Sequence, residues 1–451
     1  MRIARSLAVT CLCAAIAPAC GQTSTEPQAP LLKLQEARQI ALANRPLLRA
    51  RQFSAETARQ TTLQVESARF PQVWGNVTAA TAARDTVVQG GKEVTLDTRI
   101  AAGGLNNPTV LRRDAAGILV NQLVTDFGRT SSLVESAKLN EQSQQQQVNA
   151  TTAQVLLDVD SAYYGALEAQ TVLRVAQKTV DARKVLLDRI SALMKSKLKS
   201  ELDVRFAQVN FDEARLLLLR ARNSLEAAFT RLATSLGFRD GRRFTLLEQP
   251  DAEAPPPDLN TLLTQAIATR PELASLRADR QAAEQFVQAQ KALRYPTIKA
   301  FAAGGVVPIG DERFPQNYGA IGVNLNLPLF DGGKITALQK EARLRALAAS
   351  ENVTEAENNV ADAVRVAWLN ANATYENIEI SGHLRDAASQ ALKLAETRYN
   401  LGITSIVELN QAQLSAIDAE IAYGRAKYQY LRARSNLDYQ LGTLDGGSPS
   451  R

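Results

Sequence analysis

The segment 318–330 alternates apolar and other residues with a period of two. Its odd positions from 321 onward are all apolar, and they include Ile321, Val323, Leu325 and Leu327. The even positions include Asn324 and Asn326. Because successive side chains of a strand point to opposite faces, the segment is predicted to form a strand with one apolar and one polar face.

A second segment, 117–125, repeats this alternation less regularly, because Gln122 stands where an apolar residue is expected. Each segment is predicted to pair with a strand that follows an aromatic residue and a proline, around 73–83 and 298–307. The chain is therefore expected to contain four strands, arranged as two hairpins.

Helical sequence surrounds these hairpins. Residues 31–69 are predicted to be helical with an interruption at Asn44-Arg45-Pro46, because proline removes a backbone donor. From Gly333 to about Tyr399 no proline occurs, and a helix of that length would extend roughly 100 Å. A break is expected at 400–405, followed by an antiparallel return over 406–441. The matching break in the first half is expected at 194–200.

The chain is a tandem duplication. Arg45-Pro46 recurs as Arg270-Pro271, and the register holds without a gap through the first helical part of each copy. In a second, shorter register, Ser200 aligns with Ser405 and Leu236-Gly237 with Leu441-Gly442. The change of register corresponds to an insertion in the hairpin of the first copy, where Gly, Asn and Pro are frequent.

These features divide the chain into five parts. They are a signal peptide (1–19), a first repeat (31–247, hairpin at about 71–126), a Pro-rich linker (248–258), a second repeat (259–442, hairpin at about 296–331) and a flexible tail (443–451).

The first residues are typical of a secretory signal peptide. Arg2 and Arg5 precede a short apolar stretch, and Ala17-Pro18-Ala19 forms a small-x-small cleavage site. The alternative, a membrane-anchoring helix, is weaker because the stretch falls short of the roughly 20 residues needed to span a bilayer. Cleavage before Cys20 would also permit lipidation of that cysteine.

Composition excludes several classes of function. The chain has one histidine, His383, and its cysteines all lie at or before Cys20, so no Cys/His metal site and no cofactor are expected. The net charge is +6 with both signs interspersed, which does not indicate nucleic-acid binding. Gly332-Gly333-Lys334 lacks the remainder of a phosphate loop and is interpreted as a turn. The chain is therefore not expected to be an enzyme.

The predicted strands suit a membrane barrel. Strands of about ten residues with one apolar face have the length and pattern of barrel strands, but four strands cannot close a barrel. Because membranes do not tolerate open sheet edges, several chains are expected to share one barrel. The alternative from pattern alone is a soluble sandwich of hairpins on a helical stalk.

Several motifs, in the same order in both copies, resemble the TolC family of outer-membrane efflux proteins. They are the Arg-Pro pairs, the aromatic-Pro pairs before the strands, Leu327-Pro328-Leu329-Phe330-Asp331-Gly332-Gly333, and Arg398-Tyr399-Asn400-Leu401-Gly402-Ile403-Thr404-Ser405. The resemblance covers about 31–442. It implies a mainly α fold in which duplicated long-helix hairpins form a periplasmic α-barrel. Four strands of each chain would contribute to a shared 12-stranded barrel of a homotrimer in outer-membrane lipid.

The resemblance also implies a gate at the hairpin tips. In the family, an acidic residue after the tip glycine lines the tunnel entrance, and a tyrosine before that glycine helps to hold it shut. These residues correspond to Glu408 and Tyr399, with Asp203 as the counterpart of Glu408 in the first copy. Thr404 replaces a basic residue of the best-known members, so their tyrosine-arginine-aspartate lock is not expected in that form. The alternative for each carboxylate is an ordinary solvated helix face.

Further roles follow from the resemblance. The chain would be the passive exit duct of an efflux or secretion system, docked to a periplasmic adaptor of an inner-membrane pump. The residues expected to contact the adaptor are Lys197, Ser200, Leu401, Gly402, Ile403 and Ser405. Ile321, Val323, Leu325 and Leu327 would face lipid. Protein secretion by the same fold and, less favoured, a periplasmic adaptor remain as alternatives, and the sequence does not identify the substrate.

Overall fold

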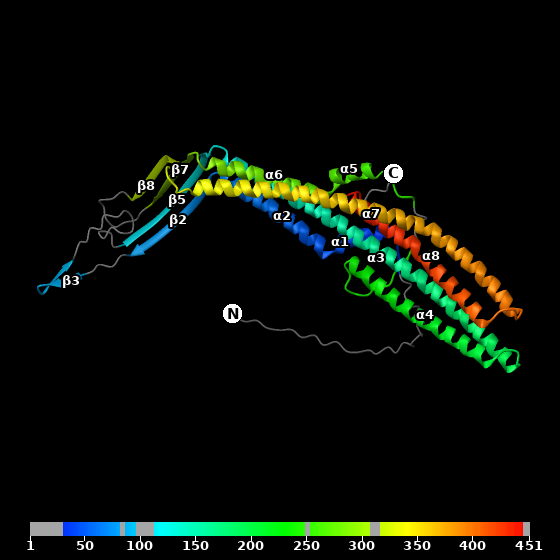
Figure 1. Ribbon diagram of the computed structural model, residues 1–451. Coiled ribbons are helices and arrows are strands. Elements are labelled where there is room, and N and C mark those ends of the chain that lie inside the picture. Colours follow the sequence, from blue (N-terminus) through cyan, green and yellow to red (C-terminus); the bar gives the residue numbers. More distant parts are fainter. Residues whose placement is uncertain (1–29, 82–85, 96–111, 249–252, 307–315, 445–451) are drawn as a thin grey trace, which may run out of the picture.

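The computed structural model describes residues 30–81, 86–95, 112–248, 253–306 and 316–444. The predicted signal peptide and Cys20 lie outside these residues, as do residues 249–252 of the linker and 445–451 of the tail. The molecule is elongated, with a sheet at one end and two helical hairpin tips at the other (Figure 1).

The two repeats contain matching helices. The long helices α3 (Arg129–Lys195) and α7 (Lys334–Asn400) each have 67 residues, and α4 (Glu201–Ser235) and α8 (Ile406–Gln440) each have 35. The shorter helices are α1 (Leu34–Asn44), α2 (Pro46–Glu66), α5 (Leu259–Thr269) and α6 (Pro271–Ala292), with a 3₁₀ turn, η1, at Ser67–Arg69. The predicted long helices and the breaks before 406 and before 201 are confirmed.

Both Arg-Pro pairs mark the same break between two helices. Pro46 and Pro271 occupy the first position of α2 and α6, where a proline removes no helical hydrogen bond. The preceding arginines are extended and reach the ends of the return helices. Arg45 donates to the Thr234 carbonyl at 3.1 Å, and Arg270 donates to the side chain of Gln440 at 2.8 Å.

The four predicted strands form one antiparallel sheet. They are β2 (Gln72–Thr81), β5 (Arg112–Thr125), β7 (Thr297–Val306) and β8 (Asn317–Asn326), in the order β2-β5-β7-β8. The two hairpins therefore join edge to edge through β5 and β7 and do not stack face to face. The soluble sandwich considered above is wrong for this reason.

A register shift lies just beyond the residue that breaks the alternation in the first copy. Between Leu123 and Thr125, β5 gains one residue relative to β7. Such a bulge reverses which positions share a face, so an alternating pattern cannot continue through it. Gln122 donates to the carbonyls of Arg69 (2.9 Å) and Leu123 (2.8 Å) next to the bulge.

Two small sheets were not predicted. Leu31–Leu32 forms a strand (β1) that pairs in parallel with β6 (Thr245–Leu246), which corrects the helical prediction for those two residues. Pairing with a distant segment overrides local helical periodicity there. In the insertion of the first copy, β3 (Thr86–Gln89) pairs with β4 (Lys92–Thr95).

Equivalent aromatic residues tie the connecting segments to the long helices. The Tyr163 hydroxyl lies 3.0 Å from the Leu32 carbonyl and 2.9 Å from that of Leu247, next to β1 and β6. Trp368, its counterpart in the second copy, donates its indole N–H to the Pro256 carbonyl at 2.9 Å. The described part of the linker therefore packs on the helices at the middle of the molecule.

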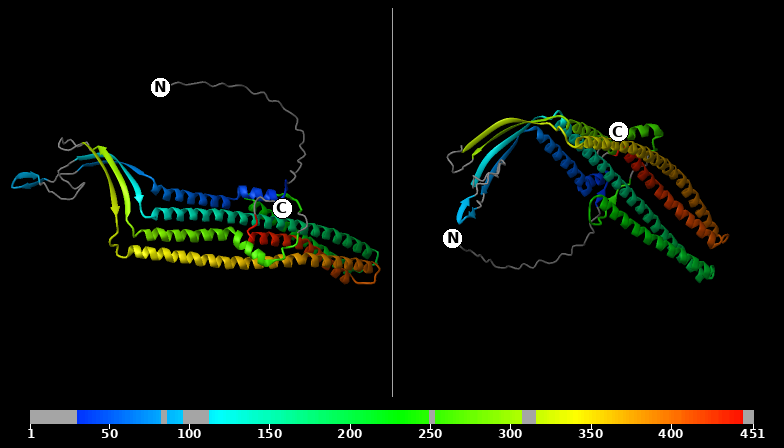
Figure 2. Two further views of the ribbon diagram at one scale, coloured as in Figure 1. Left: turned by 90° about the horizontal axis from the view of Figure 1, so that it is seen from above. Right: turned by 60° about the vertical axis from the view of Figure 1, so that its left-hand side comes forward.

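The helices lie side by side in a single layer, as the left view of Figure 2 shows. Near the sheet the order is α2-α3-α6-α7, and toward the tips it is α4-α3-α8-α7. The layer continues into the sheet, where β8 is exposed on both faces. None of the helices among the described residues is long and apolar enough to cross a membrane.

Candidate functional site

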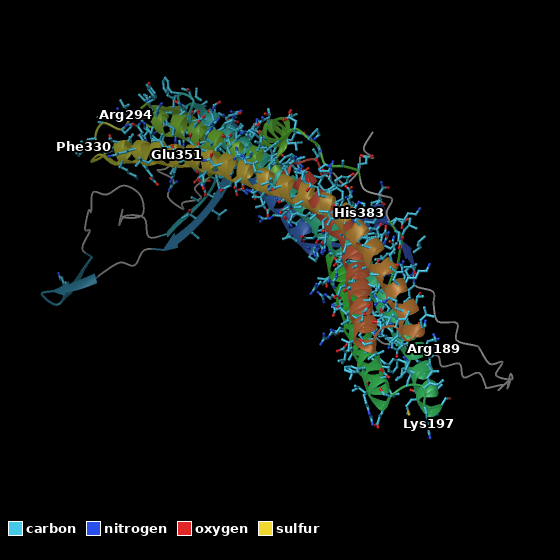
Figure 3. The ribbon with its side chains drawn as sticks, turned by 45° about the vertical axis from the view of Figure 1, so that its right-hand side comes forward. Arg189, Lys197, Arg294, Phe330, Glu351 and His383 are labelled. Atoms are coloured by element: carbon cyan, nitrogen blue, oxygen red, sulfur yellow. The ribbon has the colours of Figure 1, made fainter. Side chains whose placement is uncertain are left out.

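The predicted site lies where the two helical hairpins end, at the end of the molecule remote from the sheet (Figure 3). Both tips have the same backbone hydrogen bonds. The amide of Lys197 donates to the Met194 carbonyl at 2.9 Å, and that of Gly402 donates to the Tyr399 carbonyl at 3.1 Å. Lys197 and Gly402 have φ values of 61° and 73°, in the left-handed region that favours glycine. The first tip therefore places a lysine in a glycine conformation.

Each predicted gate carboxylate belongs to a helix cap. Ser200 and Ser405 are the N-caps of α4 and α8, and each serine hydroxyl accepts the amide three residues later, from Asp203 (3.1 Å) and Glu408 (3.4 Å). The Asp203 carboxylate accepts the Ser200 amide at 3.0 Å, which completes a capping box. Capping thus accounts for polar residues at these positions whether or not they line an entrance.

Glu408 has two further partners in the second tip. Its carboxylate forms an ion pair with Arg398 at 3.1 Å and accepts a hydrogen bond from the Thr404 hydroxyl. Thr404, which replaces the expected basic residue, therefore holds the carboxylate as a neutral donor. The cation of this cluster comes from Arg398, for which no role was predicted.

Tyr399 is buried between the two hairpins. Its side chain is 5% exposed and packs with Ile190 and Ala207 of the first hairpin and Ile406 and Leu409 of the second. The Lys199 ammonium lies 3.9 Å from the centroid of its ring, which is a cation–π contact between the tips. Sequence reasoning missed Lys199, because nothing in local spacing indicates which side chain will cover a ring of the other hairpin.

The Tyr399 hydroxyl makes no hydrogen bond to any of the described residues. The described part of the chain therefore forms no hydrogen-bonded network around it. Burial raises the pKa of Tyr399, nearby Asp203 adds to the rise, and Arg189 opposes it. The hydroxyl thus stays neutral and lies in the electrostatic field of one predicted gate carboxylate.

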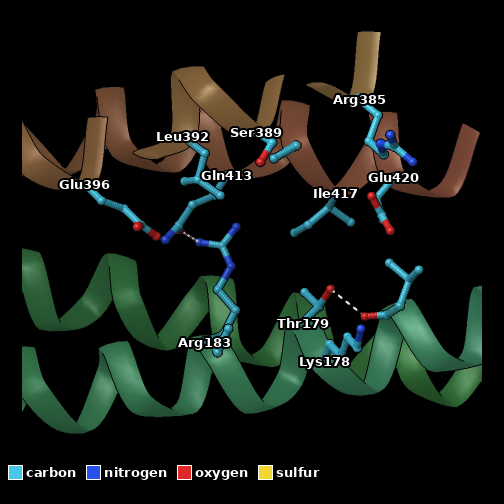
Figure 4. A pocket seen from close by; sticks show the side chains of 13 residues that line it. Lys178, Thr179, Arg183, Arg385, Ser389, Leu392, Glu396, Gln413, Ile417 and Glu420 are labelled. Atoms are coloured by element: carbon cyan, nitrogen blue, oxygen red, sulfur yellow. Dashed lines mark hydrogen bonds between the residues drawn. The ribbon is translucent and has the colours of Figure 1, made fainter. Parts of the chain in front are cut away.

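Above the tips, polar contacts join the two hairpins. The Arg183 guanidinium donates to the side-chain oxygen of Gln413 across a pocket between α3 and α8 (Figure 4). Burial lowers the pKa of Arg183, and Glu213 opposes the effect. Asn210 donates to Asn410 at 2.7 Å closer to the tips. The hairpins of one chain therefore meet through small apolar clusters separated by polar contacts.

The remaining predicted residues are exposed in the single chain. Leu401 ends α7 and, like Ile403, projects from the second tip with more than half of its surface exposed. On β8 and just beyond it, Ile321, Val323, Leu325 and Leu327 are between 45 and 89% exposed. Lys299, Asn324 and Asn326 line a polar pocket on the opposite face of the sheet, so the predicted separation into an apolar and a polar face is present.

Comparison with known proteins assigns the family. A family model described as outer membrane efflux protein matches residues 37–238 and 262–443, and the chain belongs to this family. The outer membrane protein TolC of Salmonella enteritidis is 27% identical over 354 residues, which cover 74% of this chain and 72% of TolC. The alkaline protease secretion protein AprF of Pseudomonas aeruginosa is 24% identical over 329 residues, covering 70% of this chain and 66% of AprF.

Solved structures share the fold. A membrane protein from Pseudomonas aeruginosa superimposes with a TM-score of 0.78 at 20% identity and covers 91% of this chain and 90% of that one. CusC superimposes with the same score at 16% identity, covering 91% and 92%. The mainly helical fold with duplicated hairpins is therefore confirmed.

Proposed function

We propose that the chain is the outer-membrane exit duct of an efflux or secretion system, through which an inner-membrane pump exports its substrate. The proposal rests on the family and on one structural observation. Apart from α1 and α5, which pack on α3 and α7, the described helices and the four-stranded sheet form a single layer, and no further helix or strand of the described residues continues it at either long side. One side consists of β2, α2 and α4, and the other consists of β8 and α7.

Such a layer requires neighbours on both sides. A sheet edge presents unpaired backbone groups, and these cannot stay open in a membrane. The two sides differ, so one side of each copy contacts the other side of the next copy. Such contacts form a closed ring when the rotation between successive copies divides a full turn evenly. Three copies would give 12 strands, above the eight of the smallest membrane barrels. The sheet then continues into a helical tunnel that ends at the tips.

The faces of the sheet support this arrangement. The exposed apolar side chains on β8 would contact lipid, and the polar face with Asn324 and Lys299 would line the channel. The tips would lie in the periplasm and dock an adaptor of the pump, with Lys197, Leu401 and Ile403 among the contacts. Asp203 and Glu408 would surround the entrance. The chain performs no chemistry in this role, since the pump supplies the energy.

Protein secretion is the second candidate. AprF is named as an alkaline protease secretion protein, whereas the family is named for efflux. Both uses need the same duct, and the cargo would be decided by the pump and adaptor that it meets.

The proposal is tested with the purified mature chain. It is expected to be a trimer in detergent and to form conducting channels in planar bilayers without any pump or nucleotide. A chain that stays monomeric and gives no conductance would refute the proposed duct. Co-purification with an adaptor after cross-linking in cells would then identify the pump, and with it the class of cargo.

A further inference from the structure

The polar pocket on the sheet lies where the strands meet the first turn of α3. Its volume is about 360 Å³, at the lower end of the range for small-molecule sites. Its lining includes Asn121 of β5, Lys299 of β7, Asn324 of β8 and Arg129, the first residue of α3. We name it the junction pocket.

The strand register gathers these polar side chains on one face of the sheet. Lys299 pairs with Asn324 on one side and with Leu123 of β5 on the other. Asn121 stands two residues before Leu123, so the two side chains point to the same face. The bulge in β5 begins just after Leu123, beside Lys299. A lysine and two side-chain amides therefore come together next to the start of α3.

Arg129 adds a second cation to the junction pocket, and this cation has no partner. Its Nε atom is buried without a hydrogen bond, and its guanidinium forms no ion pair with any of the described residues. Arginine stays charged in proteins, and a partly buried charge that lacks a counter-ion is unfavourable. An acceptor bound in the pocket would remove this cost.

The other groups of the junction pocket leave it positively charged. Within the described part of the chain, the Lys299 ammonium has no ion pair or hydrogen bond. Among the described residues of the lining, Asp126 is the one acidic side chain, and its carboxylate accepts the amide (2.8 Å) and the hydroxyl (2.5 Å) of Thr130. The side-chain amides of Asn121 and Asn324 make no hydrogen bond to the described residues either. Two cations and two neutral donors thus face one carboxylate that is already engaged.

We propose that the junction pocket binds an oxyanion, namely the carboxylate or phosphate group of a small soluble molecule. The planar guanidinium of Arg129 can donate two parallel hydrogen bonds to such a group, and Lys299 contributes a second charge. The amides of Asn121 and Asn324 supply neutral donors. A lipid headgroup has the same chemistry, but the apolar side chains that suit lipid, such as Val323, point to the opposite face of the sheet. The ligand is therefore a solute.

In the proposed duct this face lines the channel, and the consequence for transport rests on that proposed function. Three copies would place three junction pockets around the channel, where the barrel meets the helical tunnel. Anionic groups of a passing substrate would then have a binding step far from the carboxylates at the tips. The pocket itself is formed within one chain, so binding can be measured separately from conductance.

Titration with inorganic phosphate tests the site directly. Calorimetry on the purified mature chain in nonionic detergent is expected to show about one phosphate bound per chain. Arg129→Gln with Lys299→Gln should weaken this binding about tenfold or more, because charge-assisted hydrogen bonds are lost. Lys334→Gln is the matched control, since it removes a positive charge from the equivalent first residue of α7, which does not line the pocket. It should leave phosphate affinity unchanged.

Arg129→Lys separates specific binding from charge alone. This variant keeps the positive charge but loses the planar pair of donors, so it should weaken phosphate binding severalfold. Ion selectivity in planar bilayers should remain that of the wild type. The double variant, which loses both cations, should instead become more selective for cations.

Several results would overturn the proposal. They are the absence of saturable phosphate binding to the wild type, unchanged affinity in the double variant, and an equal loss of affinity in Lys334→Gln. Phospholipid that co-purifies with the wild type and is lost from the double variant would assign the pocket to a lipid headgroup and overturn the soluble ligand.

The proposed duct fails by a different result. A conducting trimer that binds no phosphate would overturn the junction pocket and leave the duct intact. A monomeric chain without conductance would remove the duct, and site-dependent phosphate binding by that chain would still support the pocket.

Discussion

At the scale of single residues, the two tips show how one backbone motif carries different chemistry. Lys197 and Gly402 adopt the same left-handed turn, but only glycine does so without a steric penalty. The first tip carries Lys195, Lys197 and Lys199 around one exposed leucine, Leu198, whereas the second exposes Leu401 and Ile403. A partner that contacts both tips therefore meets two different surfaces on one chain.

The strain at Lys197 leads to the first prediction. Lys197→Gly is expected to stabilise the first tip against local opening by about 1 kcal/mol, because a left-handed L-residue costs about that amount. Gly402→Lys should destabilise the second tip by a similar amount, as no atom obstructs a side chain there and only the backbone conformation opposes it. Hydrogen exchange of the tip amides measures both changes. Shifts of the same sign in the two variants would contradict this account.

The second prediction concerns the carboxylates of the tips. If Asp203 and Glu408 surround the entrance, a threefold assembly brings six carboxylates together, and such rings attract cations. Asp203→Asn with Glu408→Gln should weaken block by multivalent cations and reduce cation selectivity in planar bilayers. The amides keep hydrogen-bonding oxygens for Ser200 and Thr404, so the caps should persist.

Tyr399→Phe is the matched control for that double variant. It removes a buried hydroxyl that has no hydrogen bond within the described part of the chain and leaves the charge unchanged. An increase in open probability would show that the hydroxyl finds a partner in the assembled protein. Wild-type conductance and block in the double variant would place both carboxylates on an ordinary solvated helix face.

At the scale of elements, the two faces of the sheet differ in chemistry. Val323 and Leu325 lie on the face expected to contact lipid, and Asn324 lies on the opposite face next to Lys299. Val323, Asn324 and Leu325 belong to the same strand, β8. Substitutions at these positions therefore compare a charge on one face of the strand with a charge on the other face.

The third prediction follows from this arrangement. Val323→Asp or Leu325→Asp should prevent membrane insertion, because a charge on the lipid face near mid-bilayer costs about 2–4 kcal/mol, with Asp toward the lower end. Asn324→Asp should insert and conduct. Membrane fractionation and heat-resistant trimers on gels report the outcome. Equal tolerance at the three positions would contradict the assignment of the faces.

At the scale of the whole molecule, the sheet and the tips lie at opposite ends, so the orientation of the duct can be tested with two cysteines. Lys92, beside the turn between β3 and β4, is exposed beyond the sheet, and Ile403 is exposed at the second tip. The proposed orientation places the former outside the cell and the latter in the periplasm.

The fourth prediction is that a membrane-impermeant thiol reagent labels Lys92→Cys but not Ile403→Cys in intact cells. After permeabilisation of the outer membrane, both should react. The body of the chain has no native thiol to interfere. Labelling of Ile403→Cys alone in intact cells would invert the topology.

The sequence by itself determined the features that depend on local or repeated pattern. The alternation around Val323 predicted the two faces of β8, and the absence of proline after Gly333 predicted the long helix α7. The duplication aligned Ser200 with Ser405, which the structure shows to be the N-caps of α4 and α8. These features follow from periods of two and of 3.6 residues and from helix-end chemistry, which neighbouring residues fix.

Only the tertiary structure decided which distant residues meet. Lys199 covers the ring of Tyr399, Arg398 pairs with Glu408, and Leu31–Leu32 pairs as a strand with a segment at the far end of the first repeat. The helical order α4-α3-α8-α7 also decided which apolar side chains of the outer helices stay exposed, such as Leu216 on α4 and Leu384 on α7. A heptad of leucines looks the same in sequence whether it packs within the chain or against a neighbour. The difference arises from the relative placement of helices, which local periodicity does not encode.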